Sequence, residues 1–181
     1  MKFTETPLKG SFTFELDELK DERGFFARIF CVNEFNKLGI DSKIVQANNS
    51  YNKVKNTLRG MHYQLGVAAE TKIVRCIKGA LWDVILDIRP DSPTFGHHFG
   101  VELNEQNRRS IVVPRGFAHG IFTLADNTEI LYFVTSLYSP DKERGIRWND
   151  SYFNIKWPGI PDVISLKDSN HKDFDLETHL A

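Results

Sequence analysis

The sequence predicts an all-β fold, a β-sandwich or small barrel with a few short helices. Short apolar segments with strand-like alternation recur along most of the chain, separated by turn residues such as Lys78-Gly79 and 104–107. Helix signals are sparse: Asn33 is expected to cap a short helix that runs through Leu38 and closes at Gly39, and a second short helix is expected at Ser165–Ser169. Because the 181 residues contain no repeat and no Pro/Gly/Ser-rich linker, we expect residues 1–181 to form one domain.

The N-terminal region reads as strands joined by a turn. Phe12 and Phe14 alternate with polar residues, and the segment 21–24 has the composition of a turn. Phe26, Arg28 and Phe30 are then expected to share one face of the next strand.

From Lys43 onward the pattern is that of β-structure. The expected strands are Ile44–Ser50, Thr57–Tyr63, Lys72–Ile77, Leu81–Ile88, Phe99–Leu103, Ser110–Val113, Gly120–Leu124 and Glu129–Ser136. After Pro140 the chain becomes irregular and aromatic, and we expect this tail to fold back over the barrel.

Composition excludes several classes of function. The formal net charge of −1 argues against non-specific binding of nucleic acid or of anionic membranes, which requires a strong basic excess. Residues 1–10 lack the apolar core of a signal peptide, and no apolar run approaches the roughly 18 residues of a membrane span, so we expect a cytoplasmic protein. Cys31 and Cys76 show no metal-type spacing, which favours two buried free thiols over a disulfide.

A cation, a glycine and a histidine occur together in the apolar run Leu58–Gln64. Burying Arg59 and His62 unpaired is costly, so a neighbour or a ligand must satisfy them. Simple alternation places residues three apart on opposite faces of a strand, but Gly60 permits a bulge that turns both side chains inward. The alternative for His62 is a histidine satisfied within the core or at the surface.

A second stretch, Pro114–Gly120, is typical of a tight turn that delivers His119 to the mouth of a barrel, although an ordinary hairpin remains the alternative. Together the two stretches resemble the two motifs of the cupin barrel, whose paired histidines often bind a metal. Here His62-Tyr63-Gln64 stands where a metal cupin carries His-x-His and a nearby Glu. Two isolated histidines are too few ligands for a transition metal, so no metal site is expected.

Acid–base chemistry is the expectation that remains. His62 could abstract a proton if a carboxylate fixed its tautomer. Lys72 could stabilise an oxyanion, and Tyr132 could return a proton from the opposite face. The alternatives are a solvated strand end for Lys72 and a half-buried strand aromatic for Tyr132.

The chain resembles the dTDP-4-dehydrorhamnose 3,5-epimerase family nearly end to end. The matching motifs are Asp21–Phe26, Gln46–Ser50, Leu58–Gln64, Lys72–Val74, Asp87–Arg89, Ser92–Thr94, Pro114–Gly120, Tyr132 with Thr135 and Tyr138, Pro140 with Glu143, Ile146–Asp150, Trp157-Pro158 and Ser165–Asp168. The resemblance implies a dimeric cupin or jelly-roll barrel that acts on a nucleotide-linked 4-keto-6-deoxy sugar without metal or organic cofactor.

The resemblance also implies roles for individual residues. His62 would be the base, oriented by Asp168, while Lys72 would stabilise the enolate oxygen and Tyr132 would protonate the other face. The implied substrate contacts are Arg23 and Arg59 on the diphosphate, Phe26 and Tyr138 against the nucleobase, and Gln46, Asn48, His119, Glu143 and Lys167 elsewhere in the site. An N-terminal strand of the family crosses to the partner subunit, so Arg23 and Phe26 are expected to serve the neighbouring site.

The departures from the family pattern surround the nucleotide and the rim. Arg28 stands where the family usually has a glutamate that contacts the nucleobase. Replacing a hydrogen-bond acceptor by a cation changes which edge of a base can be recognised, so a base other than thymine stays an alternative. Gly66-Val67 and Glu70 replace the usual prolines and Gln, so a looser loop before Lys72 is expected. Further departures are Phe133, where the family often has lysine, and Asn52, where it has serine.

The expected reaction is inversion of C3 and C5 of dTDP-4-dehydro-6-deoxy-D-glucose, giving dTDP-4-dehydro-L-rhamnose. The first alternative is a single-centre epimerase, or an enzyme that uses a CDP- or GDP-linked 4-keto sugar. A metal-dependent cupin enzyme and a non-catalytic sugar-nucleotide binding module are the remaining ones.

Overall fold

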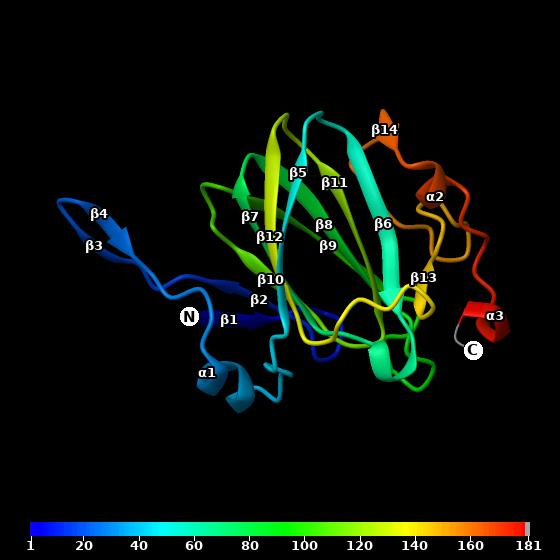
Figure 1. The fold of residues 1–181 in the computed structure, drawn as a ribbon, viewed down its shortest axis with the longest axis horizontal. Helices are drawn as coiled ribbons and strands as arrows, with labels where there is room; N and C mark the ends of the chain where they lie inside the picture. Colours follow the sequence, from blue (N-terminus) through cyan, green and yellow to red (C-terminus); the bar gives the residue numbers. More distant parts are fainter. Residues whose placement is uncertain (180–181) are drawn as a thin grey trace.

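Two mainly antiparallel β-sheets face each other in the computed structural model, which describes residues 1–179 (Figure 1). The first sheet has the strand order β1 (Lys2–Glu5), β2 (Phe12–Glu15), β10 (Ser110–Val113), β7 (Lys72–Lys78), β12 (Thr128–Val134) and β5 (Gln46–Asn52). The second has the order β13 (Glu143–Gly145), β6 (Thr57–Gln64), β11 (Phe117–Thr123), β8 (Ala80–Asp87) and β9 (His98–Asn104), and β14 (Val163–Ile164) pairs with β6 in parallel. The all-β prediction is therefore confirmed.

An arm projects from the barrel near the N-terminus (Figure 1). It is the hairpin of β3 (Leu19–Asp21) and β4 (Gly24–Phe26), whose last paired residues are Leu19 and Phe26. The predicted turn at 21–24 is confirmed. The predicted strand from Phe26 to Phe30 is wrong, because β4 ends at Phe26, where the pairing with β3 ends.

In the described residues 1–179, helical structure is limited to α1 (Val32–Lys37), the 3₁₀ turn η1 (Gly66–Ala68), α2 (Leu166–Ser169) and α3 (Leu176–His179). Both predicted helices are confirmed. The predicted cap at Asn33 is wrong, since the helix begins after Cys31, whose side chain makes no capping bond. In α2, by contrast, Ser165 Oγ accepts a hydrogen bond from the Asp168 amide at 3.0 Å, which fixes the start of the helix.

Apolar packing covers three faces of the two sheets. The central cluster lies between the sheets and includes Val74 and Ile130 from the first sheet and Ile85 from the second. The helix residue Phe35 packs on the outer face of the first sheet, and Ile146, Phe153 and Ile155 of the C-terminal tail pack on the outer face of the second. The expectation that the tail folds back over the barrel is confirmed.

Both cysteines are free thiols, as expected, although only Cys76 is fully buried and Cys31 is partly exposed. Burial raises the pKa of the Cys76 thiol to about 11, so this thiol is protonated at neutral pH. Within residues 1–179, no helix is long and apolar enough to cross a membrane.

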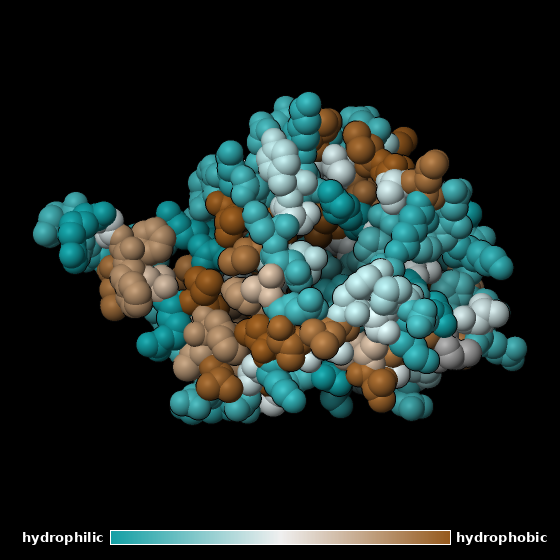
Figure 2. Space-filling view, viewed as in Figure 1, coloured by the Kyte–Doolittle hydropathy of each residue, from teal (hydrophilic) through white to brown (hydrophobic). Residues whose placement is uncertain are grey.

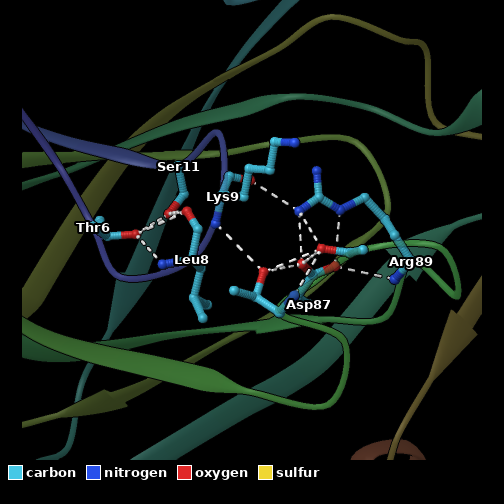
Figure 3. Close-up of polar contacts among 8 residues, drawn as sticks. Thr6, Leu8, Lys9, Ser11, Asp87 and Arg89 are labelled. Carbon is cyan, nitrogen blue, oxygen red and sulfur yellow. Dashed lines mark hydrogen bonds and ion pairs between the residues drawn. The ribbon is translucent and has the colours of Figure 1, made fainter.

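A buried carboxylate at the end of β8 ties the N-terminal loop to the barrel (Figure 3). Asp87 accepts hydrogen bonds from Arg89 at 2.6 Å, Ser92 at 2.5 Å and Thr94 at 2.6 Å, and Arg89 also donates to the Lys9 carbonyl at 2.9 Å. Burial by itself raises the pKa of Asp87, but the hydrogen bonds from these three side chains outweigh it and hold the pKa below its ordinary value. Asp87 is therefore the charged centre of this corner.

Candidate active site

A polar cavity opens between the two sheets where their inward-facing residues change from apolar to polar. Along β7, Cys76 and Val74 face the core and Lys72 faces the cavity, and along β12 Ile130 is followed by Tyr132. The cavity has a volume of about 410 Å³ and adjoins a second hollow of about 200 Å³. His62, Lys72 and Tyr132 line both hollows, whose sizes lie in or near the range of small-molecule sites.

His62 on β6 forms a close pair with Asp168 on α2. The distance from His62 Nε2 to Asp168 Oδ1 is 2.8 Å, and the Gly60 amide donates to Asp168 Oδ2 at 3.1 Å. Burial raises the pKa of Asp168, but His62, Gly60 and Ser165 favour the carboxylate and lower the pKa below its ordinary value. An ionised Asp168 holds the ring proton of His62 on Nε2, which leaves Nδ1 as the basic atom.

Gly60 provides the predicted bulge. His62 pairs with His119, and Arg59 pairs with Ile121. Between these two pairs β6 advances by three residues and β11 by two, so β6 carries one extra residue. Gly60 has φ +121°, and a Cβ there would lie 2.6 Å from the Gly120 Cα. As predicted, Arg59 and His62 line one hollow together.

Arg59 is positioned by Asn52. Its Nε donates to Asn52 Oδ1 at 2.6 Å, across from β5. Asn52 is buried, and its side chain holds Arg59 at Nε. Arg59 as a whole residue stays exposed.

A second histidine–carboxylate pair lies beside the first. His119 Nε2 is 3.0 and 2.9 Å from the two oxygens of Asp83, which is completely buried on β8. The sequence analysis identified His119 but missed Asp83. The available signal was a carboxylate at an inward position between Leu81 and Ile85, where an unpaired charge is costly.

Lys72 reaches the cavity from β7 and is held by a carboxylate. Its Nζ lies 3.3 Å from Glu70 Oε1, while Gln64 Nε2 donates to Glu70 Oε2 at 3.2 Å. Glu70 therefore fastens this end of the loop to both β6 and β7. Lys72 presents a positive charge to the cavity on the sheet opposite His62.

Tyr132 faces the cavity from β12, so it lies on the sheet opposite His62. Burial, and secondarily the charge of Glu70, raises the pKa of Tyr132, while Arg59 acts in the opposite direction. The phenol is therefore fully protonated at neutral pH, the form that can donate a proton.

The rim of the cavity contains the remaining predicted contacts that lie in the barrel. Tyr138 OH donates to Glu143 Oε2 at 2.8 Å, and Lys167 Nζ lies 2.5 Å from the same oxygen. The Tyr138 amide donates to Gln46 Oε1 at 3.2 Å, and Asn48 lines the cavity next to Gln46.

The predicted contacts on the arm do not join this cavity within one chain. Arg23 is 83% exposed and pairs with Asp21 on its own hairpin. Phe26 and Arg28 line a separate shallow cleft beside the N-terminus, where Arg28 Nη1 lies 3.9 Å from Glu34 Oε1. Within one chain, these three residues therefore lie apart from His62.

Comparison with known proteins identifies relatives along nearly the whole chain. The family model for dTDP-4-dehydrorhamnose 3,5-epimerase matches residues 5–175. The enzyme of that name from Shigella flexneri is 42% identical over 175 residues, which cover 96% of each chain. The crystal structure of the enzyme from Elizabethkingia anophelis superimposes with a TM-score of 0.92 at 38% identity, covering 96% of each chain. An epimerase from Legionella pneumophila, solved in complex with dTDP-4-keto-L-rhamnose, has a TM-score of 0.90 at 34% identity, covering 99% of this chain and 97% of its own.

Proposed function

The chain belongs to the dTDP-4-dehydrorhamnose 3,5-epimerase family, a family of isomerases with a cupin-like jelly-roll fold, and we propose that it inverts both C3 and C5 of dTDP-4-dehydro-6-deoxy-D-glucose. One observation carries the proposal. His62, which pairs with Asp168, and Tyr132 lie on opposite sheets of one cavity, and Lys72 lines the same cavity. A base and an acid on opposite faces are what inversion of a carbon centre requires.

The C4 ketone makes the hydrogens on C3 and C5 acidic. His62 Nδ1 takes the proton from the carbon, the C–H electron pair moves into an enolate, and the negative charge collects on O4. Asp168 stabilises the resulting imidazolium, and a positioned base of this kind contributes about 10²–10⁴-fold to the rate. The Lys72 ammonium stabilises the charge on O4.

Tyr132 completes the inversion. Its phenol donates a proton to the opposite face of the same carbon, the enolate collapses back to the ketone, and solvent then restores the protonation states of Tyr132 and His62. The raised pKa of Tyr132 keeps the phenol protonated before each step. Repetition at the second carbon gives dTDP-4-dehydro-L-rhamnose, the sugar nucleotide that the Legionella structure holds.

We further propose that the working unit is a homodimer in the cytoplasm. Leu19 and Phe26 are 69% and 68% exposed on the arm, and Figure 2 shows apolar side chains continuing from the arm onto the adjacent edge of the barrel. A contiguous apolar surface of this kind is typical of an interface. An exchanged arm carries Arg23 and Phe26 toward the neighbouring cavity, which needs a cation for a diphosphate and a ring to stack on a base.

Solvent exchange tests the reaction. With the keto sugar nucleotide in D₂O, the enzyme is expected to place deuterium at both C3 and C5, and His62→Ala is expected to abolish the exchange. His97→Ala, which removes an exposed histidine outside the cavity, serves as the matched control and should exchange at the wild-type rate. Label at one carbon only would assign the enzyme to the single-centre epimerases, and unchanged exchange in His62→Ala would remove the proposed base.

The nucleobase is tested with a panel of dTDP-, CDP-, UDP- and GDP-linked 4-keto sugars. We expect the dTDP sugar to give the highest kcat/KM. If the CDP or GDP sugar is preferred and Arg28→Glu restores the preference for thymine, then Arg28 has changed the base that the site recognises.

A further inference from the structure

A third imidazole lies against the proposed catalytic pair. His171, which follows α2, is 15% exposed, and its Nε2 lies 3.8 Å from Asp168 Oδ1. The rings of His171 and His62 are 6.1 Å apart between centroids and meet edge to face at 78°. His171 Nε2 is buried and has no hydrogen-bond partner among residues 1–179. None of the proposed proton transfers uses this nitrogen.

Gly145 leaves the space that the His171 ring occupies. Gly145 pairs with His62 between β13 and β6, and a Cβ at this position would lie 2.1 Å from His171 Nε2. Any other residue at 145 would therefore displace the ring from the pair. The backbone of β13 thus holds His171 beside both His62 and Asp168.

We propose that His62, Asp168 and His171 form a binding site for a zinc-like divalent metal ion, and that the bound ion inhibits the epimerase. One ligand atom from each residue lies within 4.8 Å of the other two. In tetrahedral zinc sites with Zn–N and Zn–O bonds of about 2.0–2.2 Å, neighbouring ligand atoms are about 3.3 Å apart. The separations of 2.8 Å and 3.8 Å to Asp168 Oδ1 bracket that value, and the ligand atoms of the two imidazoles lie within 4.8 Å of each other, so rotation of the two rings toward a common point completes the site.

The ligand set selects the kind of metal. Two imidazoles and one carboxylate suit zinc and the later transition metals, whereas Mg²⁺ and Ca²⁺ favour sites made of oxygen ligands. Glu143 adds negative charge near the site, and Lys167, which pairs with Glu143, adds an opposing positive charge. Solvent water can supply the fourth ligand from the cavity side.

Inhibition follows from the tautomer of His62. A neutral imidazole carries one ring proton, and an ion on Nε2 requires that proton to lie on Nδ1. Nδ1 is the atom that takes the substrate proton in the proposed reaction, so the zinc-bound enzyme has no base. Binding of the ion rests on the geometry of three residues alone, while inhibition also rests on the proposed function.

Binding is tested first, without reference to activity. The chelator-stripped full chain is titrated with ZnCl₂ in a calorimeter, and one tight site per chain is expected. His171→Ala is expected to weaken zinc binding at least tenfold, roughly the cost of losing even an outer-shell partner of a metal ligand. His97→Ala removes an exposed histidine elsewhere and should leave the affinity unchanged. Mg²⁺ should give no signal at the same concentrations.

Soaking crystals of the wild-type protein in zinc locates the ion by its anomalous scattering. This measurement does not depend on whether the His171→Ala variant folds. An anomalous peak between His62, Asp168 and His171 would support the site. A peak elsewhere with none at this position, or equal zinc affinity in folded His171→Ala and wild type, would overturn it.

Activity is measured second, as deuterium exchange with and without zinc, each variant being compared with its own rate in chelator. Inhibition that follows zinc occupancy in wild type, and is lost in His171→Ala, is expected. Tight zinc binding to an enzyme that catalyses no exchange would contradict the proposed function and leave the site standing. An active enzyme that binds no zinc would contradict the zinc site and leave the proposed function standing.

Discussion

His62 Nε2 and Asp168 Oδ1 lie 2.8 Å apart, although the two residues are 106 positions apart in the chain. The bulge at Gly60 turns His62 toward the cavity, and the Gly60 amide also donates to Asp168. The same glycine therefore positions both members of the pair. Because Asp168 is held beside His62 in this way, its carboxylate is the first group to test by mutation.

Asp168→Asn keeps the shape of the side chain but removes its charge. The amide can then donate to His62 Nε2, which favours the wrong tautomer, so kcat should fall by about 10²–10⁴-fold with little change in KM. Steady-state kinetics check this, with the exposed Asp91→Asn as the matched control. A kcat within threefold of wild type would show that His62 does not need its partner.

Tyr132→Phe separates exchange from inversion. His62 can still remove a proton and return a deuteron to the same face, but the phenol that protonates the opposite face is gone. Formation of inverted product should fall by about 10²–10⁴-fold, while deuterium continues to enter the unreacted substrate. NMR of the recovered sugar nucleotide distinguishes the two processes. Tyr152→Phe, in which an exposed tyrosine outside the cavity is changed, should behave as wild type.

Lys72→Met removes the charge near O4 and keeps most of the side-chain volume. Because the ammonium acts mainly on charge that develops during the reaction, kcat should fall by about 10²–10³-fold and KM should change little. Lys142→Met, at an exposed lysine, is the control. An increase in KM alone would instead assign Lys72 to substrate binding.

The corner built around Asp87 makes stability depend on pH. A carboxyl whose pKa is lowered by folding stabilises the protein above its ordinary pKa of 3.8, and this contribution is lost as the pH falls through the lower, folded-state value. Asp87→Asn should therefore reduce the free energy of unfolding by about 3 kcal/mol at pH 7, as expected when a buried ion pair loses one partner. Urea unfolding at a series of pH values should show the difference from wild type shrinking below pH 3.8. A difference that is constant with pH would mean that charge at Asp87 is not its origin.

Residue pattern predicts the barrel well because alternation is a local signal. The strands from β5 to β12 lie within a few residues of their predicted positions, and Gly60 forms the predicted bulge. β13 and β14 were missed because they are short strands that add to the edge of β6, and nothing local marks them. The partner of His62 came from a family resemblance, since no local pattern joins positions 62 and 168. Asp83 and His171 were missed for the same reason, as their partners are close only in space.

The proposed exchange of arms can be tested by mixing two inactive enzymes. Arg23→Ala damages the arm, and His62→Ala damages the cavity. If each arm serves the partner's cavity, a hybrid dimer contains one site with both defects and one site with neither. Random mixing makes half of the dimers hybrids, so activity should recover to roughly one quarter of wild type, measured at substrate concentrations well below KM.

The recovery depends on which residues share a site. His62→Ala mixed with Asp168→Asn provides the control, because both residues belong to the same chain's cavity and every site in the hybrid stays defective. We expect no recovery from that pair. If the first mixture also stays inactive while native mass spectrometry detects the hybrid dimer, then Arg23 does not act in the partner's site. The exposed apolar residues Leu19 and Phe26 would then serve association alone.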